Sequence, residues 1–249
     1  MFFKFPSEEE WNDLEGSYPF EKLGIRDDDF EYTFENANTV LKWSATSEIE
    51  TWKNHLINRL IQTRWSFVFL MFHFNKGIPD KQWLMSPGPE GESIRYFPHF
   101  TMDDHKVKAQ FDFYVDIFYY KLFSAWDTVG HLLNMMCELR IERSTFFKAV
   151  QALQSVNPHL HQGLAAIIES DHFRTVQDFR HAITHNHLPG HIGSSVRRIS
   201  DNEMTFGGGS YTPSAEIQAN IIQALDLFAE TLKVIREHQI TRTTDPVLL

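Results

Sequence analysis

The sequence contains little cysteine, and this excludes two classes of protein at once. Cys137 is the single cysteine among 249 residues. One thiol cannot form an intramolecular disulfide framework or a cysteine-based zinc cluster. Such sparse use of cysteine is typical of a reducing compartment, so we expect a cytoplasmic protein.

Long apolar runs are also missing. The longest, residues 65–72, is interrupted by Ser66 and is much shorter than the ~20 residues that cross a bilayer. Residues 1–10 hold one lysine followed by three glutamates, unlike the cationic and then apolar start of a secretory signal. We therefore expect no membrane span.

Basic residues are outnumbered, but only at the N-terminus. The formal net charge is −10, and residues 1–50 contain 13 acidic and 4 basic side chains. Residues 51–249 contain 20 acidic and 19 basic side chains, which leaves the body of the protein nearly neutral. A local cationic cleft that binds phosphate is compatible with this distribution.

The acidic N-terminal segment, residues 1–45, is rich in aromatics but has no clear hydrophobic period. We expect an arm that packs a few aromatics on the body, with short strands possible at residues 30–33 and 39–43. The run Asp27, Asp28 and Asp29 suggests an alternative, an acidic flap over a basic cleft.

Apolar residues at steps of three and four predict helices over most of the remaining chain. The expected helices cover residues 47–75, 104–140, 144–155, 159–170, 171–187 and 212–239. Residues 76–103 contain four prolines and three glycines, so they predict a long surface connection. A hairpin is possible around residues 201–202.

These elements predict an all-α protein. We expect an antiparallel helical bundle of four to five long helices, with an N-terminal acidic extension that is α/β or irregular. The predicted divisions are the extension at 1–45, a helical domain at 46–240 and a tail at 241–249.

The candidate chemistry lies in a cluster of histidines. Seven of the 13 histidines fall within residues 159–191, and residues 178–187 read Asp-Phe-Arg-His-Ala-Ile-Thr-His-Asn-His. Arg180 and His185 are five residues apart at the end of a predicted helix, about 140° apart on an ideal helix, and the length of arginine lets them converge. A guanidinium can bind a phosphate through two hydrogen bonds, and an imidazole can accept or donate a proton near neutral pH.

Arg180, His181 and His185 resemble the HEPN superfamily signature, an arginine, a polar residue, about three variable positions and then a histidine. The surrounding helical bundle, residues 46–240, extends the resemblance. It implies a dimer in which two motifs form a metal-independent RNA-cleaving site, with no cofactor. In such a site His185 acts as general base or acid, Arg180 stabilises the phosphorane, and His181 orients one of them or touches phosphate.

The resemblance also implies a toxin or defence effector, with RNA or a nucleotide as ligand and an antitoxin protein as a possible partner. Asp127 is a candidate acidic partner for Arg180. The further candidate binding residues lie on the adjacent predicted helix, directly after the motif and in the glycine-punctuated loop beyond: His131, Asn186, His187, Arg197 and Arg198.

Three alternatives stay open. The first is a structural role, in which Arg180 and His185 pair with Asp178 or cap a helix end, and Ser124, Asp127, His131 and Asn134 form a hydrogen-bonded seam. The second is a catalytically silent HEPN-like module that binds a nucleotide, RNA or a protein. The third is a metal-dependent hydrolase, because His181 and His185, like Asp127 and His131, are i, i+4 pairs, with Asp178, His187 and His191 nearby.

Overall fold

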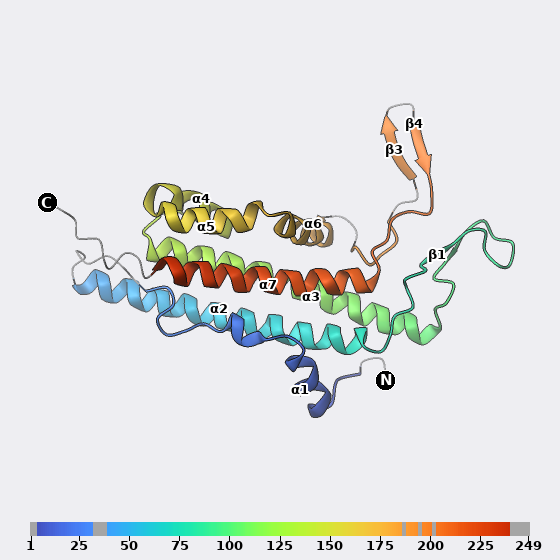
Figure 1. Cartoon of the computed structure of the whole chain (residues 1–249), viewed down its shortest axis with the longest axis horizontal. Helices are drawn as coiled ribbons and strands as arrows, with labels where there is room; N and C mark the ends of the chain where they lie inside the picture. Colours follow the sequence, from blue (N-terminus) through green and yellow to red (C-terminus); the bar gives the residue numbers. More distant parts are fainter. Residues whose placement is uncertain (1–3, 32–38, 186–187, 194–195, 201–202, 240–249) are drawn as a thin grey trace. The chain divides into compact units, whose positions relative to one another are not determined.

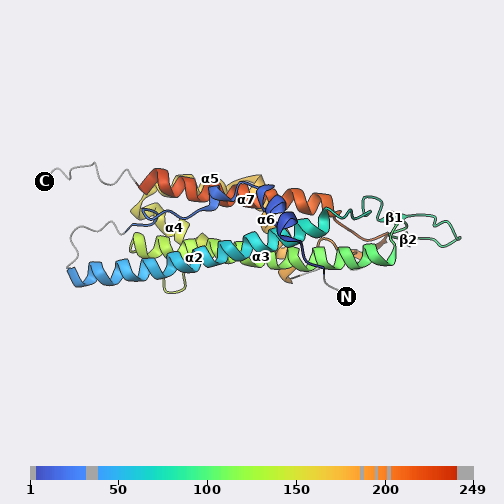
Figure 2. The ribbon, with the colours of Figure 1, turned by 90° about the horizontal axis from the view of Figure 1, so that it is seen from below.

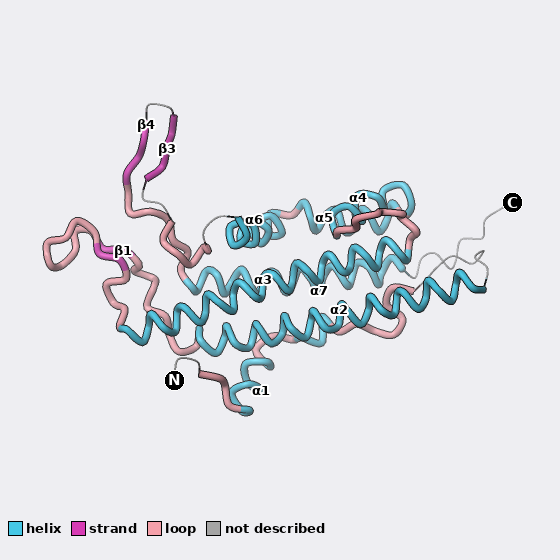
Figure 3. Tube along the Cα trace, turned by 180° about the vertical axis from the view of Figure 1, so that it is seen from behind, coloured by secondary structure: helices cyan, strands magenta, loops and turns pink. Residues whose placement is uncertain are grey.

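The protein is described by a computed structural model that covers residues 4–31, 39–185, 188–193, 196–200 and 203–239. These residues are mostly helical, with two small antiparallel sheets (Figure 3). The elements in chain order are α1 (Glu8–Gly16), the 3-10 helix η1 (Phe20–Leu23), α2 (Thr39–Phe74), β1 (Leu84–Met85), β2 (Arg95–Tyr96), α3 (Met102–Met136), α4 (Phe146–Val156), α5 (Pro158–Glu169), α6 (Asp171–His185), β3 (Val196–Ser200), β4 (Glu203–Phe206) and α7 (Ser214–Gln239).

The all-α class is confirmed, and the sheets are confined to connections. β1 and β2 lie in the long connection between α2 and α3, where Leu84 pairs with Tyr96 (Figure 2). β3 and β4 form the expected hairpin between α6 and α7, with Val196 opposite Phe206 (Figure 1).

The N-terminal prediction needs two corrections. Residues 39–43, suggested as a strand, form the first turns of α2, which begins eight residues before the predicted start. Residues 8–16 form α1, which the sequence analysis did not predict. A capping box begins α1: the Glu10 amide donates to Ser7 Oγ, and the Ser7 amide donates to the Glu10 carboxylate.

The chain divides into two compact units, each assembled from three stretches. Of the described residues, those within 1–18, 65–118 and 175–223 belong to unit 1, and those within 19–64, 119–174 and 224–249 belong to unit 2. The long helices α2, α3 and α7 each contribute to both. The family motif lies in unit 1.

In unit 2, the helices pack around Trp126 of α3. Its ring is 1% exposed and contacts Phe146 of α4, Phe173 of α6 and Phe228 of α7. Its indole N–H donates to Thr231 Oγ1 at 3.2 Å, so the polar atom of this buried side chain is paired. Residues from four helices therefore share one core.

Asp27 and Asp29, in the part of the N-terminal segment that belongs to unit 2, make polar contacts with the helices of that unit. Lys53 of α2 donates to the Asp27 carbonyl at 2.7 Å. Arg236 of α7 donates to both carboxylate oxygens of Asp29, which is 3% exposed. Asp29 is thus paired with Arg236 of α7 and does not face a basic cleft.

In unit 1, aromatic contacts hold α2 and α3 together. Phe69 stacks on Tyr114 with ring centroids 4.8 Å apart, and Phe74 contacts Phe111. The neighbouring His73 is also buried and lies parallel to Tyr114 at 5.9 Å. This packing fixes the part of α3 that supports the loops around the motif.

Candidate functional site

Helix α6 carries the motif in its final turns. Its start is capped by Ser170, whose hydroxyl accepts from the Phe173 amide at 3.1 Å, and Phe173 and Val176 are fully buried. Arg180 is half-buried and His181 is exposed. The backbone of α6 ends at His185, whose side chain lies outside the described part of the structure.

An open hollow of about 360 Å³ borders α6 at this end. Its walls come from α6, from the loop that follows it and from the segment before α7, and comprise Asp178, Phe179, Ala182, Leu188, Pro189, His191, Gly193, Ser210, Tyr211 and Thr212. Two backbone bonds join the loops: the Gly193 amide donates to the Ser210 carbonyl, and the Thr212 amide donates to the Pro189 carbonyl. The hollow therefore has two walls tied to each other beside the motif helix. We call it the motif hollow.

A buried ion pair on α3 fixes the first of these loops. Lys108 donates to both oxygens of Asp112, at 2.6 and 2.7 Å, and to the Gly190 carbonyl at 2.9 Å. His191 Nε2 lies 3.6 Å from Asp112 Oδ2 and is itself largely exposed. Burial raises the pKa of Asp112, and the adjacent Lys108 opposes that shift.

The second loop is fixed by Asp80, which follows α2. Asp80 is 2% exposed and accepts from the Ser214 amide at 2.8 Å and from the Ser214 hydroxyl at 2.9 Å. The Tyr211 hydroxyl also donates to Asp80, at 2.6 Å. Burial first, and then the bond to Asp80, raise the pKa of Tyr211, so this wall of the hollow carries a neutral phenol.

The sequence candidates on α3 have structural partners in unit 2. Asp127 accepts from the Phe146 amide at 3.2 Å, where α4 begins. His131 stacks on Trp52 with centroids 4.2 Å apart, and burial lowers its pKa, with Asp127 acting in the opposite direction. Asn134 exchanges two hydrogen bonds with the Ile141 backbone. Asp127 and Asn134 thus make hydrogen bonds to backbone groups of other segments, and His131 makes a ring stack.

The remaining candidates are described only in part. Asn186 and His187 lie outside the described residues. Arg197 and Arg198 belong to β3, paired with Thr205 and Met204, and their side chains lie outside the described part. Their roles in binding stay predictions.

The described part of the structure contains no cluster of side chains that would support the metal alternative. No three His, Cys, Asp or Glu side chains among them gather as a metal site does. His187 and the side chain of His185 lie outside the described part of the structure, so the metal alternative stays a hypothesis.

Sequence reasoning missed the residues that fix the two loops. Lys108 and Asp112 did leave a signal, a charged i, i+4 pair on a helix whose neighbours Phe111 and Val115 are core residues. Asp80 left none, because its partners Tyr211 and Ser214 are more than 130 residues away.

Within the described ranges, no helix is both long enough and apolar enough to cross a membrane. The structure is thus that of an all-α protein whose sequence places Arg180 and His185 in the last turns of a helix. A family model described as Cthe2314-like HEPN matches residues 52–239, more than half of the chain, and the protein belongs to the HEPN superfamily. Searches of curated proteins and of solved structures gave no match.

Proposed function

We propose that this HEPN protein cleaves RNA without a metal ion, by attack of a ribose 2′-hydroxyl on the adjacent phosphate. One observation carries the proposal: the Arg180–His185 motif occupies the last turns of the helix that forms one wall of the motif hollow. His185 follows Ala182, a lining residue, by three positions. Its Cα therefore lies on the same side of α6 by helical register.

In the proposed reaction, His185 accepts the proton of the 2′-hydroxyl as its oxygen bonds to phosphorus. The bond from phosphorus to the 5′-oxygen breaks, and that oxygen takes a proton from water, which leaves a 2′,3′-cyclic phosphate and a 5′-hydroxyl. Arg180 stabilises the negative charge that develops on the phosphorane. His181 orients one of these groups or contacts phosphate, while Asn186, His187, Arg197 and Arg198 contact the strand.

We further propose that two copies share the site. Arg180 and His185 are about 140° apart on an ideal helix and converge within one copy only through the length of arginine, so one phosphate is reached most readily when two motifs face each other. Arg180 of one copy would then act with His185 of the other. Arg180→Ala and His185→Ala proteins, each inactive, are expected to recover part of the activity when mixed. No recovery, with exchange of subunits verified, contradicts the shared site.

The test of cleavage uses a single-stranded RNA with EDTA present. Arg180→Ala and His185→Ala are each expected to lower the rate at least about 100-fold, the size typical of a lost acid–base or charge-stabilising group. Arg174→Ala and His172→Ala are matched controls, since both residues are exposed on the first turn of the same helix. Thermal unfolding of all four variants is expected to match the parent protein.

Two results would overturn this function. Cleavage that persists in either motif variant removes the assigned roles. Binding of RNA without turnover by the parent protein selects instead the silent binding module. Growth arrest on expression, lost in His185→Ala, tests whether the activity serves as a toxin.

A further inference from the structure

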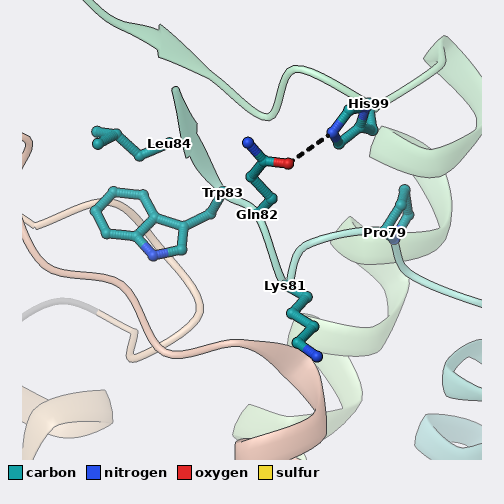
Figure 4. Close-up of a pocket in the computed structure, with 6 residues that line it drawn as sticks. All are labelled: Pro79, Lys81, Gln82, Trp83, Leu84 and His99. Atoms are coloured by element: carbon teal, nitrogen blue, oxygen red, sulfur yellow. Dashed lines mark hydrogen bonds between the residues drawn. The ribbon is translucent and has the colours of Figure 1, made fainter. Parts of the chain in front are cut away.

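A second hollow lies in unit 1, outside the motif. Its volume is about 690 Å³, within the range of about 300–1,000 Å³ usual for ligand sites. It is lined by Pro79, Lys81, Gln82, Trp83, Leu84 and His99, which follow α2 and precede α3 (Figure 4). We call it the Trp83 hollow.

Its aromatic wall is held in place by other rings. Trp83 is half-buried and contacts Tyr96 and Tyr211, with centroids 6.4 and 5.4 Å away. Tyr96 in turn donates from its hydroxyl to the Gly208 carbonyl at 3.1 Å. A ring fixed by its neighbours loses little freedom when a flat ligand stacks on it.

The polar side chains of the lining are those of Lys81, Gln82 and His99. Lys81 and His99 are exposed, and none of the six lining residues is acidic. Asp80, the next residue along, turns its carboxylate to Tyr211 and Ser214. His99 Nε2 lies 3.0 Å from the Gln82 side-chain oxygen, and donation by His99 leaves the Gln82 amide NH2 to donate to a ligand (Figure 4).

We propose that the Trp83 hollow binds an unpaired base of single-stranded RNA. The base stacks on Trp83, the amide of Gln82 donates to a base oxygen or nitrogen, and Lys81 contacts a neighbouring phosphate. An aromatic ring beside a cation is the usual composition of sites for unpaired bases, because every base has a face that stacks.

This inference rests on the proposed function and extends it to the substrate. Tyr211 lines the motif hollow and its ring contacts that of Trp83, which lines the second hollow, so this pair of rings connects the two. In this proposal, a strand with a base at Trp83 continues past Tyr211 to the motif, where another of its phosphates is bound. The site selects single strands, because a paired base cannot enter.

Affinity for a fluorescent RNA of about ten nucleotides tests the site, measured by anisotropy in the His185→Ala protein with EDTA, so that no cleavage occurs. Trp83→Ala is expected to weaken binding about tenfold or more, the usual cost of one lost base stack. Trp83→Phe, which keeps a ring, is expected to retain most of the affinity. Trp65→Ala is the matched control, because Trp65 is 52% exposed and lines neither hollow.

The salt dependence of RNA binding distinguishes the stacking contact of Trp83 from the phosphate contact of Lys81. Lys81→Gln is expected to reduce the slope of log K against log salt by about 0.7, the value for one lost phosphate contact on a single strand. Trp83→Ala is expected to leave that slope unchanged. The same RNA as a duplex is expected to bind weakly to the parent and to be insensitive to Trp83→Ala.

Cleavage of a dinucleotide distinguishes failure of this site from failure of the nuclease. If the protein cleaves RNA and Trp83→Ala changes neither affinity nor kcat/KM for the long strand, the subsite is wrong and the nuclease stands. If no RNA is cleaved but Trp83→Ala weakens RNA binding, the base-binding site is supported and the nuclease is not. Equal affinity for a free mononucleotide and for the strand overturns the strand proposal. We expect Trp83→Ala to lower kcat/KM more for the long strand than for the dinucleotide, which is too short to reach the Trp83 hollow.

Discussion

Lys108 holds the carbonyl of Gly190 at 2.9 Å, across 82 positions of sequence. The same ammonium group forms a two-oxygen ion pair with Asp112, and both charged side chains are 8% exposed. This contact anchors the loop directly after the motif, so it links the core of unit 1 to the wall of the motif hollow. The position of that wall is the first property that substitutions can test.

Gly190→Ala is expected to displace the loop. An added Cβ would lie 2.5 Å from Lys108 Nζ and 2.7 Å from Asp112 Oδ1, closer than such atoms approach. We expect a loss of about 1–3 kcal/mol in the free energy of unfolding, measured by urea denaturation, as for other overpacked interiors. The rate of cleavage is expected to fall by more than the lower stability would cause, because the displaced loop forms a wall of the motif hollow. Gly207→Ala is the control, because a Cβ there meets no heavy atom within 4 Å. Equal effects of the two substitutions would refute this explanation.

Asp80→Ala is expected to loosen the other wall. The substitution removes the acceptor of three hydrogen bonds and leaves the buried Ser214 amide at the start of α7 without its partner. We expect a loss of about 2–4 kcal/mol in the free energy of unfolding. Tyr211→Phe removes only one of the three bonds and is expected to cost about 1 kcal/mol. Similar losses from both substitutions would show that the bonds to Ser214 contribute nothing.

The sequence predicts helices where burial follows a helical period. The stripe of Ile217, Ile221, Leu225 and Phe228 predicted α7, and all four residues are at most 1% exposed. The sequence did not predict the start of α2, because residues 39–43 include β-branched and aromatic residues, which favour strands. Val40 and Trp43 are each 73% exposed, so no buried stripe marked the first turns of this helix.

The candidate site, too, can be predicted from the sequence only in part. The motif is local to α6, so its place at the end of a helix is readable from the chain. The two hollows are not, because their walls meet only after folding. Trp83 and Tyr211, for example, are in contact although α3 to α6 separate them in sequence. Such contacts depend on tertiary packing, for which the spacing of residues contains no signal.

Asp29 and Arg236 offer a test of the N-terminal segment. Both bonds of this pair are 2.8 Å long, and the Asp29 bonds raise the pKa of Arg236 despite its partial burial. Because each single substitution leaves a buried or half-buried charge unpaired, Asp29→Ala and Arg236→Ala are each expected to cost about 3 kcal/mol in the free energy of unfolding. The double variant is expected to cost much less than the sum. Additive losses in this cycle would mean that the two side chains do not interact.

His73 predicts how stability depends on pH. It is 1% exposed, neither ring nitrogen has a hydrogen-bond partner among the described residues, and burial, with Lys76 adding to it, lowers its pKa to about 4. In the unfolded chain the value is about 6.5. The unfolded state therefore takes up the proton first as the pH falls, and stability is expected to drop between pH 6.5 and 4, by up to about 3 kcal/mol.

His73→Phe isolates this effect, because phenylalanine keeps a ring beside Tyr114 and removes the titrating group. Urea denaturation at intervals from pH 7 to 4 is expected to show a flatter decline in stability for His73→Phe than for the parent. His172→Phe, at an exposed position, is expected to keep the decline of the parent. If His73→Phe and the parent lose stability in parallel, then His73 takes up its proton equally in both states, and its buried position imposes no cost on the folded protein.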